Sequence, residues 1–133
     1  MKAGSALLLD SCAVIAHFKR SKSILNILQQ AGGLYLPLAA YGELYYGALK
    51  AGKSQERFEE LNEFMQIVTL LSPNQYTAQI YGDIRLSLAL KGQPIPENDL
   101  WIAATARQYG MTVLTSDAHF ERIECIELKM FGE

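Results

Sequence analysis

Four acidic side chains in this sequence are of a type that can bind a divalent cation together. They are Asp10, Glu43, Asp99 and Asp117. Carboxylate oxygens are the ligands that hard cations such as Mg²⁺ and Mn²⁺ prefer. A cation held in this way activates a water molecule and polarises a phosphoryl oxygen, which is the chemistry of phosphodiester hydrolysis. The hypothesis holds only if the fold brings these distant residues together.

Three of these acids have a simpler explanation as helix caps. An Asp side chain at an N-cap accepts a hydrogen bond from a free backbone N–H, which stabilises a helix by about 1 kcal/mol. Asp10, Asp99 and Asp117 each stand where a helix or a turn is expected to begin. Taken singly, each of them could be a cap and nothing more.

Glu43 is harder to explain by structure alone. Residues 38–47 contain no other charged side chain, and the residues beside Glu43 on a helix are small. An acidic side chain among apolar neighbours is rarely buried without a partner. Lys50, further along the same helix, is one candidate partner, and a shared cation is the other. Clustered carboxylates need such a cation or a proton, because two charges about 4 Å apart in a partly buried site repel by roughly 4 kcal/mol.

The spacing of apolar residues predicts the elements that must position these acids. Short apolar segments of strand length alternate with longer segments of helical period, which indicates a parallel sheet covered by helices on both faces. Strands are expected at residues 7–9, 34–36, 67–71, 112–115 and 125–128. Helices are expected at residues 11–19, 24–30 and 38–51, from Ser54, from Ser72-Pro73 to about Lys91, and from Asn98 or Asp99 to Tyr109, with a short turn or helix at 117–122. We therefore expect residues 1–133 to form one domain of the α/β class, a three-layer α/β/α fold with about five parallel strands.

This arrangement places the four acids near one edge of the sheet. Asp10 follows the first expected strand and Asp117 follows the fourth, while Glu43 and Asp99 lie in the first turns of helices. In parallel sheets of this kind, ligands bind beyond the carboxyl ends of the strands. The sequence therefore predicts a metal site at that edge.

Composition and charge limit where the protein can be located and how it can bind nucleic acid. No apolar segment approaches the roughly 20 residues that a membrane span needs, so we expect no membrane association and a cytoplasmic protein. The formal net charge is −2, whereas a protein that binds nucleic acid by charge alone should be basic. A cluster of carboxylates can make the net charge of a protein negative while the surface around the cluster stays basic. Lys19, Arg20 and Lys22 form a short basic group that could steer RNA phosphates, although such groups are commonly just solvated.

Three segments resemble the PIN-domain nucleases, and among these the VapC-like toxins of toxin–antitoxin pairs. They are LLLDSCAVIAHF (residues 7–18), AAYGELYYGALKAG (39–52) and GQPIPENDLWIAATARQYGMTVLTSDAHFERI (92–123). The resemblance covers essentially the whole chain in order. It implies a PIN-like parallel-sheet fold, RNA cleavage that depends on Mg²⁺ or Mn²⁺, a cognate small antitoxin protein as partner, and in many members a homodimer. Asp10, Glu43, Asp99 and Asp117 stand at the positions of the family's acidic residues.

Residues next to these acids have less certain roles. Ser11, Thr115 and Ser116 could hydrogen-bond metal waters or phosphate, or could simply cap. Position 12 is often a polar residue such as Asn in the resembled family, and Cys12 here is expected to pack as a small apolar side chain or to orient Asp10 weakly. We expect both cysteines to be free thiols. His17 is expected to be a surface or packing residue, and His119 to face solvent while Phe120 anchors the turn.

Other functions remain open at this stage. A PIN-domain nuclease in RNA maturation or decay would have the same acids without acting as a toxin. A phospho-acceptor signalling domain also gathers acids around Mg²⁺, but it needs an acceptor Asp after a middle strand, where this chain has Leu71-Ser72-Pro73. A phosphatase that forms an aspartyl-phosphate needs a second Asp two residues after the first, and Cys12 stands there.

Overall fold

A parallel sheet with its first strand in the centre organises the protein. The computed structural model describes residues 4–132. Within that range the sheet has five strands in the order β3-β2-β1-β4-β5, and every neighbouring pair is parallel. The strands are β1 (Ala6–Leu9), β2 (Gly33–Pro37), β3 (Thr69–Leu71), β4 (Thr112–Thr115) and β5 (Glu127–Met130). The expected number and direction of strands are therefore confirmed.

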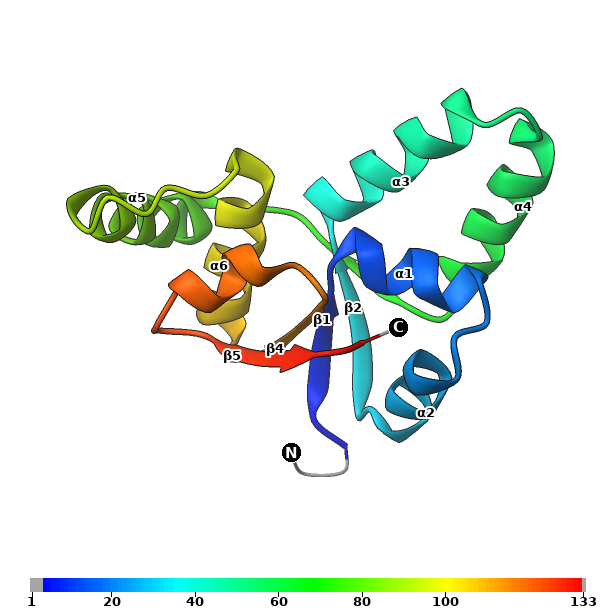
Figure 1. The fold of residues 1–133 in the computed structure, drawn as a ribbon, viewed down its shortest axis with the longest axis horizontal. Helices are drawn as coiled ribbons and strands as arrows, with labels where there is room; N and C mark the ends of the chain where they lie inside the picture. The colour runs from blue at the N-terminus through cyan, green and yellow to red at the C-terminus, as the bar shows by residue number, and fades with distance from the viewer. Residues whose placement is uncertain (1–3, 133) are drawn as a thin grey trace.

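Helices cover both faces of this sheet (Figure 1). They are α1 (Ser11–Phe18), α2 (Lys22–Gln30), α3 (Leu38–Lys50), α4 (Ser54–Phe64), α5 (Gln75–Leu90), α6 (Glu97–Tyr109) and the short 3₁₀ helix η1 (Ala118–Arg122). Parallel crossovers are right-handed, so the connections from β1 through β3 put α1 to α4 on one face and the return to β4 puts α5 and α6 on the other. Among the helices of residues 4–132, none combines the length and the apolar character that crossing a bilayer requires.

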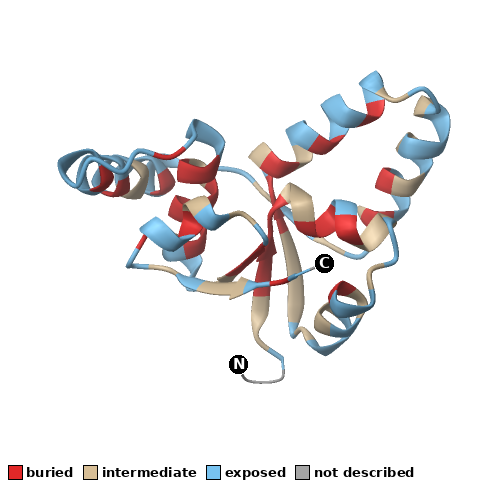
Figure 2. Ribbon diagram, in the orientation of Figure 1, coloured by how far each residue is buried: buried red, intermediate tan, exposed pale blue. Residues whose placement is uncertain are grey.

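The central position of β1 explains its composition. Leu7, Leu8 and Leu9 have no exposed surface because helices cover them from both sides (Figure 2). Strands buried on both faces are continuous apolar runs rather than alternating ones. Leu9 pairs in register with Leu114 of β4, so the two strands end side by side. Residues that directly follow β1 and β4 are thereby placed next to each other.

The start of α5 and the position of β5 differ from the sequence-based expectation. Helix α5 begins after Asn74 rather than at Ser72-Pro73, because Asn74 Oδ1 accepts hydrogen bonds from the backbone N–H groups of Tyr76 and Thr77. The Thr77 hydroxyl in turn accepts from the Asn74 N–H, which completes a capping box. The last strand is Glu127–Met130 rather than residues 125–128, since its register with β4 pairs Thr112 with Glu127.

The core fixes the segments that carry the candidate site. Phe120 is completely buried, so η1 is anchored to the core directly after Asp117, as expected. Helix α6 ends at Gly110, whose φ of 66° is the left-handed conformation that glycine tolerates best. His17 packs against the rings of Phe18 and Phe64, which confirms its interpretation as a packing residue.

Candidate active site

Asp10 is held by groups from helix α1 and from strand β4. Its Oδ1 accepts a 2.8 Å hydrogen bond from the Ser11 N–H at the start of α1. Its Oδ2 accepts a 2.8 Å hydrogen bond from the Thr115 hydroxyl and a longer one, 3.4 Å, from the Cys12 thiol. Asp10 is therefore the N-cap of α1, but capping occupies only one of its oxygens. The carboxylate is buried, at 5% exposure, and fixed in orientation.

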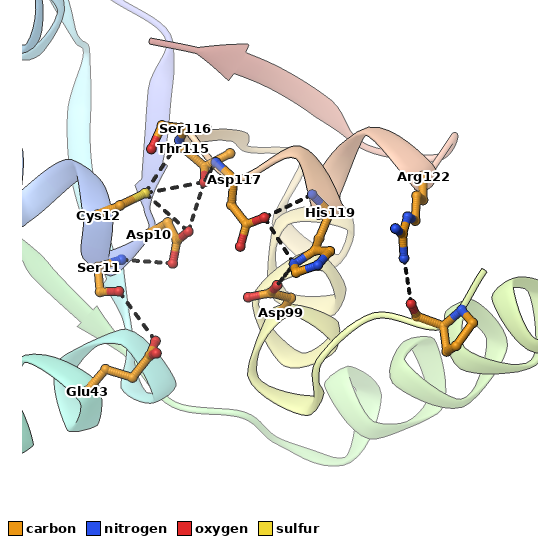
Figure 3. A network of polar contacts seen from close by, with 11 residues as sticks. Asp10, Ser11, Cys12, Glu43, Asp99, Thr115, Ser116, Asp117, His119 and Arg122 are labelled. Carbon is orange, nitrogen blue, oxygen red and sulfur yellow. Dashed lines mark hydrogen bonds and ion pairs between the residues drawn. The ribbon is translucent and has the colours of Figure 1, made fainter. Parts of the chain in front are cut away.

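Hydrogen bonds also connect the end of β4 and the segment after it to Asp10 and Cys12 (Figure 3). Thr115 Oγ1 accepts a 3.0 Å hydrogen bond from the Asp117 N–H while it donates to Asp10. The Ser116 N–H donates to Cys12 Sγ at 3.4 Å. Cys12 is thus a polar participant that contacts Asp10, Thr115 and Ser116, rather than only a small apolar side chain. Burial and the nearby Asp10 charge raise the pKa of its thiol, and both cysteines are free.

His119 lies against two of the acids, which corrects the expectation that it faces solvent. The Asp117 side chain caps η1 by accepting a 2.9 Å hydrogen bond from the His119 N–H. This turn brings the imidazole back over the acids, so that His119 Nδ1 lies 3.0 Å from Asp117 Oδ1 and 3.4 Å from Asp99 Oδ2. The side chain is 40% exposed, but its Nδ1 atom is buried. Sequence spacing alone shows that His119 is near Asp117, but not which way its ring turns.

Asp99 is buried in the first turn of α6 and does not cap it. The helix begins at Glu97 after Pro96, so the expectation that Asn98 or Asp99 caps it was wrong. The Asp99 side chain is 10% exposed, and its Oδ2 atom has no hydrogen-bond partner. Burial and the charges of Asp10 and Asp117 raise the pKa of this carboxyl to about 6, although His119 opposes the rise. An acid in this situation requires a proton or a cation.

Glu43 approaches from α3 on the other side of Asp10 (Figure 3). Its Oε1 lies at a long hydrogen-bonding distance, 3.5 Å, from the Ser11 hydroxyl. Partial removal from water and the charge of Asp10 raise its pKa, and hydrogen bonds from Asn98 and Ser11 partly offset this. The side chain is exposed rather than enclosed among apolar residues. Lys50 is not its partner, since the Lys50 ammonium lies 4.9 Å from the centre of the Tyr46 ring.

The four predicted acids therefore converge, with an inner group and an outer pair. Asp99, Asp117 and His119 each offer a ligand atom, and these atoms lie within 4.8 Å of one another. Asp10 and Glu43 are outside this inner group, but both act electrostatically on Asp99. A set of oxygen ligands with one nitrogen, including a buried oxygen that lacks a hydrogen bond, fits a divalent cation. The residues present are thus chemically suited to hold one.

Two of the three basic residues, Lys19 and Arg20, line different hollows. Lys19 lines a groove of about 270 Å³ between α1, α3 and α4 that also contains Glu43 and Arg57. Arg20 lines a different hollow, together with Glu60 and Glu63. Lys19 is therefore near the acids, whereas Arg20 faces acidic residues of α4. A role for Lys19, Arg20 and Lys22 in steering RNA stays a prediction.

Comparison with known proteins decides the family. The family model of the PIN domain matches residues 7–124. The chain is 33% identical over 121 residues to Ribonuclease VapC2 of Haemophilus influenzae, which covers 87% of this chain and 90% of the relative. The chain belongs to the VapC ribonucleases of the PIN-domain family. This confirms the resemblance and argues against the signalling-domain and phosphatase alternatives.

Solved VapC-type structures share the fold along nearly the whole chain. VapBC2 from Rickettsia felis, solved with a DNA fragment from their promoter, matches with a TM-score of 0.89 at 25% identity, over 96% of this chain and 99% of that chain. VapBC-1 from nontypeable Haemophilus influenzae matches with a TM-score of 0.85 at 25% identity, over 94% and 97%. The PIN-like α/β/α architecture is thereby confirmed. A shorter match, 32% identical over 82 residues, is the tRNA(fMet)-specific endonuclease VapC of Shigella flexneri, covering 61% of this chain and 62% of the relative.

Proposed function

We propose that this chain is a Mg²⁺- or Mn²⁺-dependent endoribonuclease that hydrolyses phosphodiester bonds and acts as the toxin of a toxin–antitoxin pair. The observation that carries the proposal is the buried Asp99 carboxylate, whose Oδ2 lacks a hydrogen-bond partner although Asp117 and His119 lie beside it. Membership of the VapC family supports ribonuclease as the activity, since the Haemophilus relative bears that name.

The chain's own residues would hold and orient the ion. We assign it to the carboxylates of Asp10, Glu43, Asp99 and Asp117. Such an ion would supply an activated water and counter-charge for the phosphoryl oxygens. Ser11 N and Thr115 Oγ1 fix the two oxygens of Asp10, so this carboxylate needs no reorganisation when substrate arrives. The hydroxyl groups of Ser11 and Ser116, which lie beside Glu43 and Cys12 respectively, are candidate contacts to phosphate.

RNA would reach these acids along the surface that holds Lys19. Lys19 lines the groove that also contains Glu43, so positive charge lies beside this acid despite the negative net charge of the chain. Arg57 lines the same groove but is paired with Glu60. Positive groups near a catalytic site raise the local concentration of a polyanion. Lys19 is therefore the best placed of the three basic residues for steering.

We propose that the same groove binds the cognate antitoxin. Its apolar lining comes from α1, α3 and α4 and includes Phe18, Leu44 and Leu61. Tyr45, Tyr46 and Leu49 are exposed on α3. A partner segment lying in this groove would reach Glu43 and could block access to the acids. The structural relatives VapBC2 of Rickettsia felis and VapBC-1 of Haemophilus influenzae support an antitoxin as the occupant.

A homodimer is part of this proposal. Tyr76, Leu86 and Leu90 are exposed on α5, on the side of the sheet away from the groove. Exposed apolar side chains gathered on one helix are typical of a subunit interface. Light scattering of the purified protein would measure its mass. A mass of about one chain at micromolar concentration would contradict the dimer.

The test is RNA cleavage with matched variants. The wild-type protein, Asp10→Asn, Asp99→Asn and the control Asp83→Asn are induced briefly, and RNA ends are sequenced alongside growth curves. Asp83 lies exposed on α5, away from the four acids, so its variant should cleave like the wild type. Transfer RNA belongs among the purified substrates because of the Shigella relative. Equal cleavage by all four proteins would overturn the proposal, whereas cleavage without growth arrest would favour the alternative role in RNA maturation or decay.

A further inference from the structure

The imidazole of His119 is aimed at the acids without being hydrogen-bonded to them (Figure 3). Nδ1 lies 3.0 Å from Asp117 Oδ1 and 3.4 Å from Asp99 Oδ2, distances at which a hydrogen bond would be expected. Neither contact is a hydrogen bond, since Nδ1 and Asp99 Oδ2 are both buried polar atoms without a hydrogen-bond partner. Two adjacent buried polar atoms that both lack a hydrogen-bond partner indicate a binding site for an ion between them.

The spacing of these atoms matches ligands around one ion. Ligands about 2.1 Å from an octahedral ion lie roughly 3 Å from their neighbours in the coordination sphere. The two Nδ1–oxygen distances, 3.0 and 3.4 Å, are close to this value. The Asp99 side chain is also nine-tenths buried and directed into the same space. The arrangement therefore differs from an acidic cluster on a surface, where side chains point into water.

We propose that His119 Nδ1 is a nitrogen ligand of the metal ion, beside Asp99 and Asp117, and that the site consequently favours Mn²⁺ over Mg²⁺. This inference rests on the proposed function, because it concerns the same ion. Imidazole nitrogen suits transition metals such as Mn²⁺ better than it suits Mg²⁺, which strongly prefers oxygen ligands and retained water. Ligation through Nδ1 requires that the imidazole carries its proton on Nε2.

Another interpretation of the geometry is that His119 is a built-in counter-ion. A protonated imidazole would then lie between Asp99 and Asp117 only until a metal displaces it. Both interpretations place a positive group against the acids, but only the first keeps nitrogen bonded to the ion. The outcome of a spectroscopic experiment on the bound ion distinguishes them.

Electron spin-echo spectroscopy of Mn²⁺ bound to the full chain tests the inference. The sequence has two histidines, and His17 packs on Phe18 and Phe64, so His17→Gln is a matched control. We expect a nitrogen coupling of a directly bound imidazole in the wild type and in His17→Gln, and its loss in His119→Gln. The Mn²⁺ affinity of His119→Gln should fall by about tenfold or more, while its Mg²⁺ affinity changes by less than about threefold.

Isotope labelling gives a check without mutation. Substituting ¹⁵N-histidine in the unmutated protein should convert the ¹⁴N coupling into a ¹⁵N coupling, whether or not His119→Gln folds. Bound Mn²⁺ with oxygen ligands alone would overturn the His119 assignment and support the counter-ion. Failure of the wild type to bind either Mn²⁺ or Mg²⁺ would instead overturn the proposed function.

Discussion

The Thr115 hydroxyl donates a 2.8 Å hydrogen bond to Oδ2 of Asp10, although the two residues are 105 positions apart in the sequence. The bond joins the ends of β1 and β4 at the centre of the sheet. Thr115 also accepts a hydrogen bond from the Asp117 N–H, so one hydroxyl orients Asp10 and positions Asp117. The geometry of two candidate metal ligands therefore depends on a side chain that is not itself a ligand.

Replacing Thr115 by Val should weaken both stability and metal binding. Val has a similar shape but no hydroxyl, so a buried carboxylate oxygen and the Asp117 N–H each lose a partner. We expect a loss of about 1–3 kcal/mol in the free energy of unfolding and a fall of about tenfold or more in Mn²⁺ affinity. Denaturant titration and calorimetry measure the two effects. Thr105→Val is the control, since that buried hydroxyl donates only to the Trp101 carbonyl within α6. Equal Mn²⁺ affinities for the two variants would refute the role of Thr115.

Asp99→Asn should stabilise the metal-free protein near pH 7.5 and abolish its response to metal. The substitution removes a buried charge that Asp10 and Asp117 repel. In the wild type, an ion at 100 times its dissociation constant should raise stability by about 2.7 kcal/mol. Thermal unfolding with and without Mn²⁺ measures this, with Asp83→Asn as the control. The prediction fails if Asp99→Asn retains the metal-induced rise in melting temperature.

The pH dependence of the metal-free protein follows from the raised pKa of Asp99. The carboxyl titrates near 3.8 when unfolded and near 6 in the fold, so between these values the folded state holds more protons. Stability from this residue is therefore complete below about pH 4 and is lost as the pH rises through 6. The full loss corresponds to roughly 2–3 kcal/mol.

Comparison with Asp99→Asn isolates this residue from other titrating groups. The difference in unfolding free energy, variant minus wild type, should increase between about pH 4 and pH 6 and level off above pH 7. Denaturant titrations in the presence of a chelator provide the data. A difference that does not change with pH would show that the Asp99 pKa is not raised.

Phe120→Ala tests how the core positions the segment that holds Asp117 and His119. Phe120 is fully buried, and replacing such a side chain by Ala typically lowers stability by about 3–5 kcal/mol. Because η1 loses its anchor, Mn²⁺ affinity should also fall at temperatures where the variant is still folded. Tyr109→Ala, at an exposed aromatic position at the C-terminal end of α6, is the control. Unchanged metal affinity in a folded Phe120→Ala protein would show that the metal site does not depend on the burial of Phe120.

The sheet and the four acids could be predicted because they depend on patterns along the chain. The leucines of β1 are a continuous apolar run, and Asp10 directly follows it. Parallel strands then bring Asp10 and Asp117 to one edge regardless of side-chain detail. Glu43 could be identified because no other charge lies near it in the sequence, although its side chain proved to be exposed and not paired with Lys50.

The predictions that differ from the structure concern details that depend on side-chain geometry, which the sequence pattern does not reveal. Ser72-Pro73 is a good start for a helix, but the reciprocal bonds of Asn74 and Thr77 place the start two residues later. His119 was expected in solvent because a sequence does not reveal that η1 is a 3₁₀ turn, which directs the ring toward Asp99. The Cys12 thiol likewise reaches Thr115 and the Ser116 N–H only because β1 and β4 end side by side.

The central place of β1 has a consequence for protein synthesis. The ribosome adds Asp10 to the chain 105 residues before Thr115, to which Asp10 is hydrogen-bonded in the fold. A nascent chain that lacks β4 and the segment after it has neither the hydroxyl that orients Asp10 nor Asp117. The four-acid site therefore cannot assemble until β4 and the segment that follows it have been synthesised.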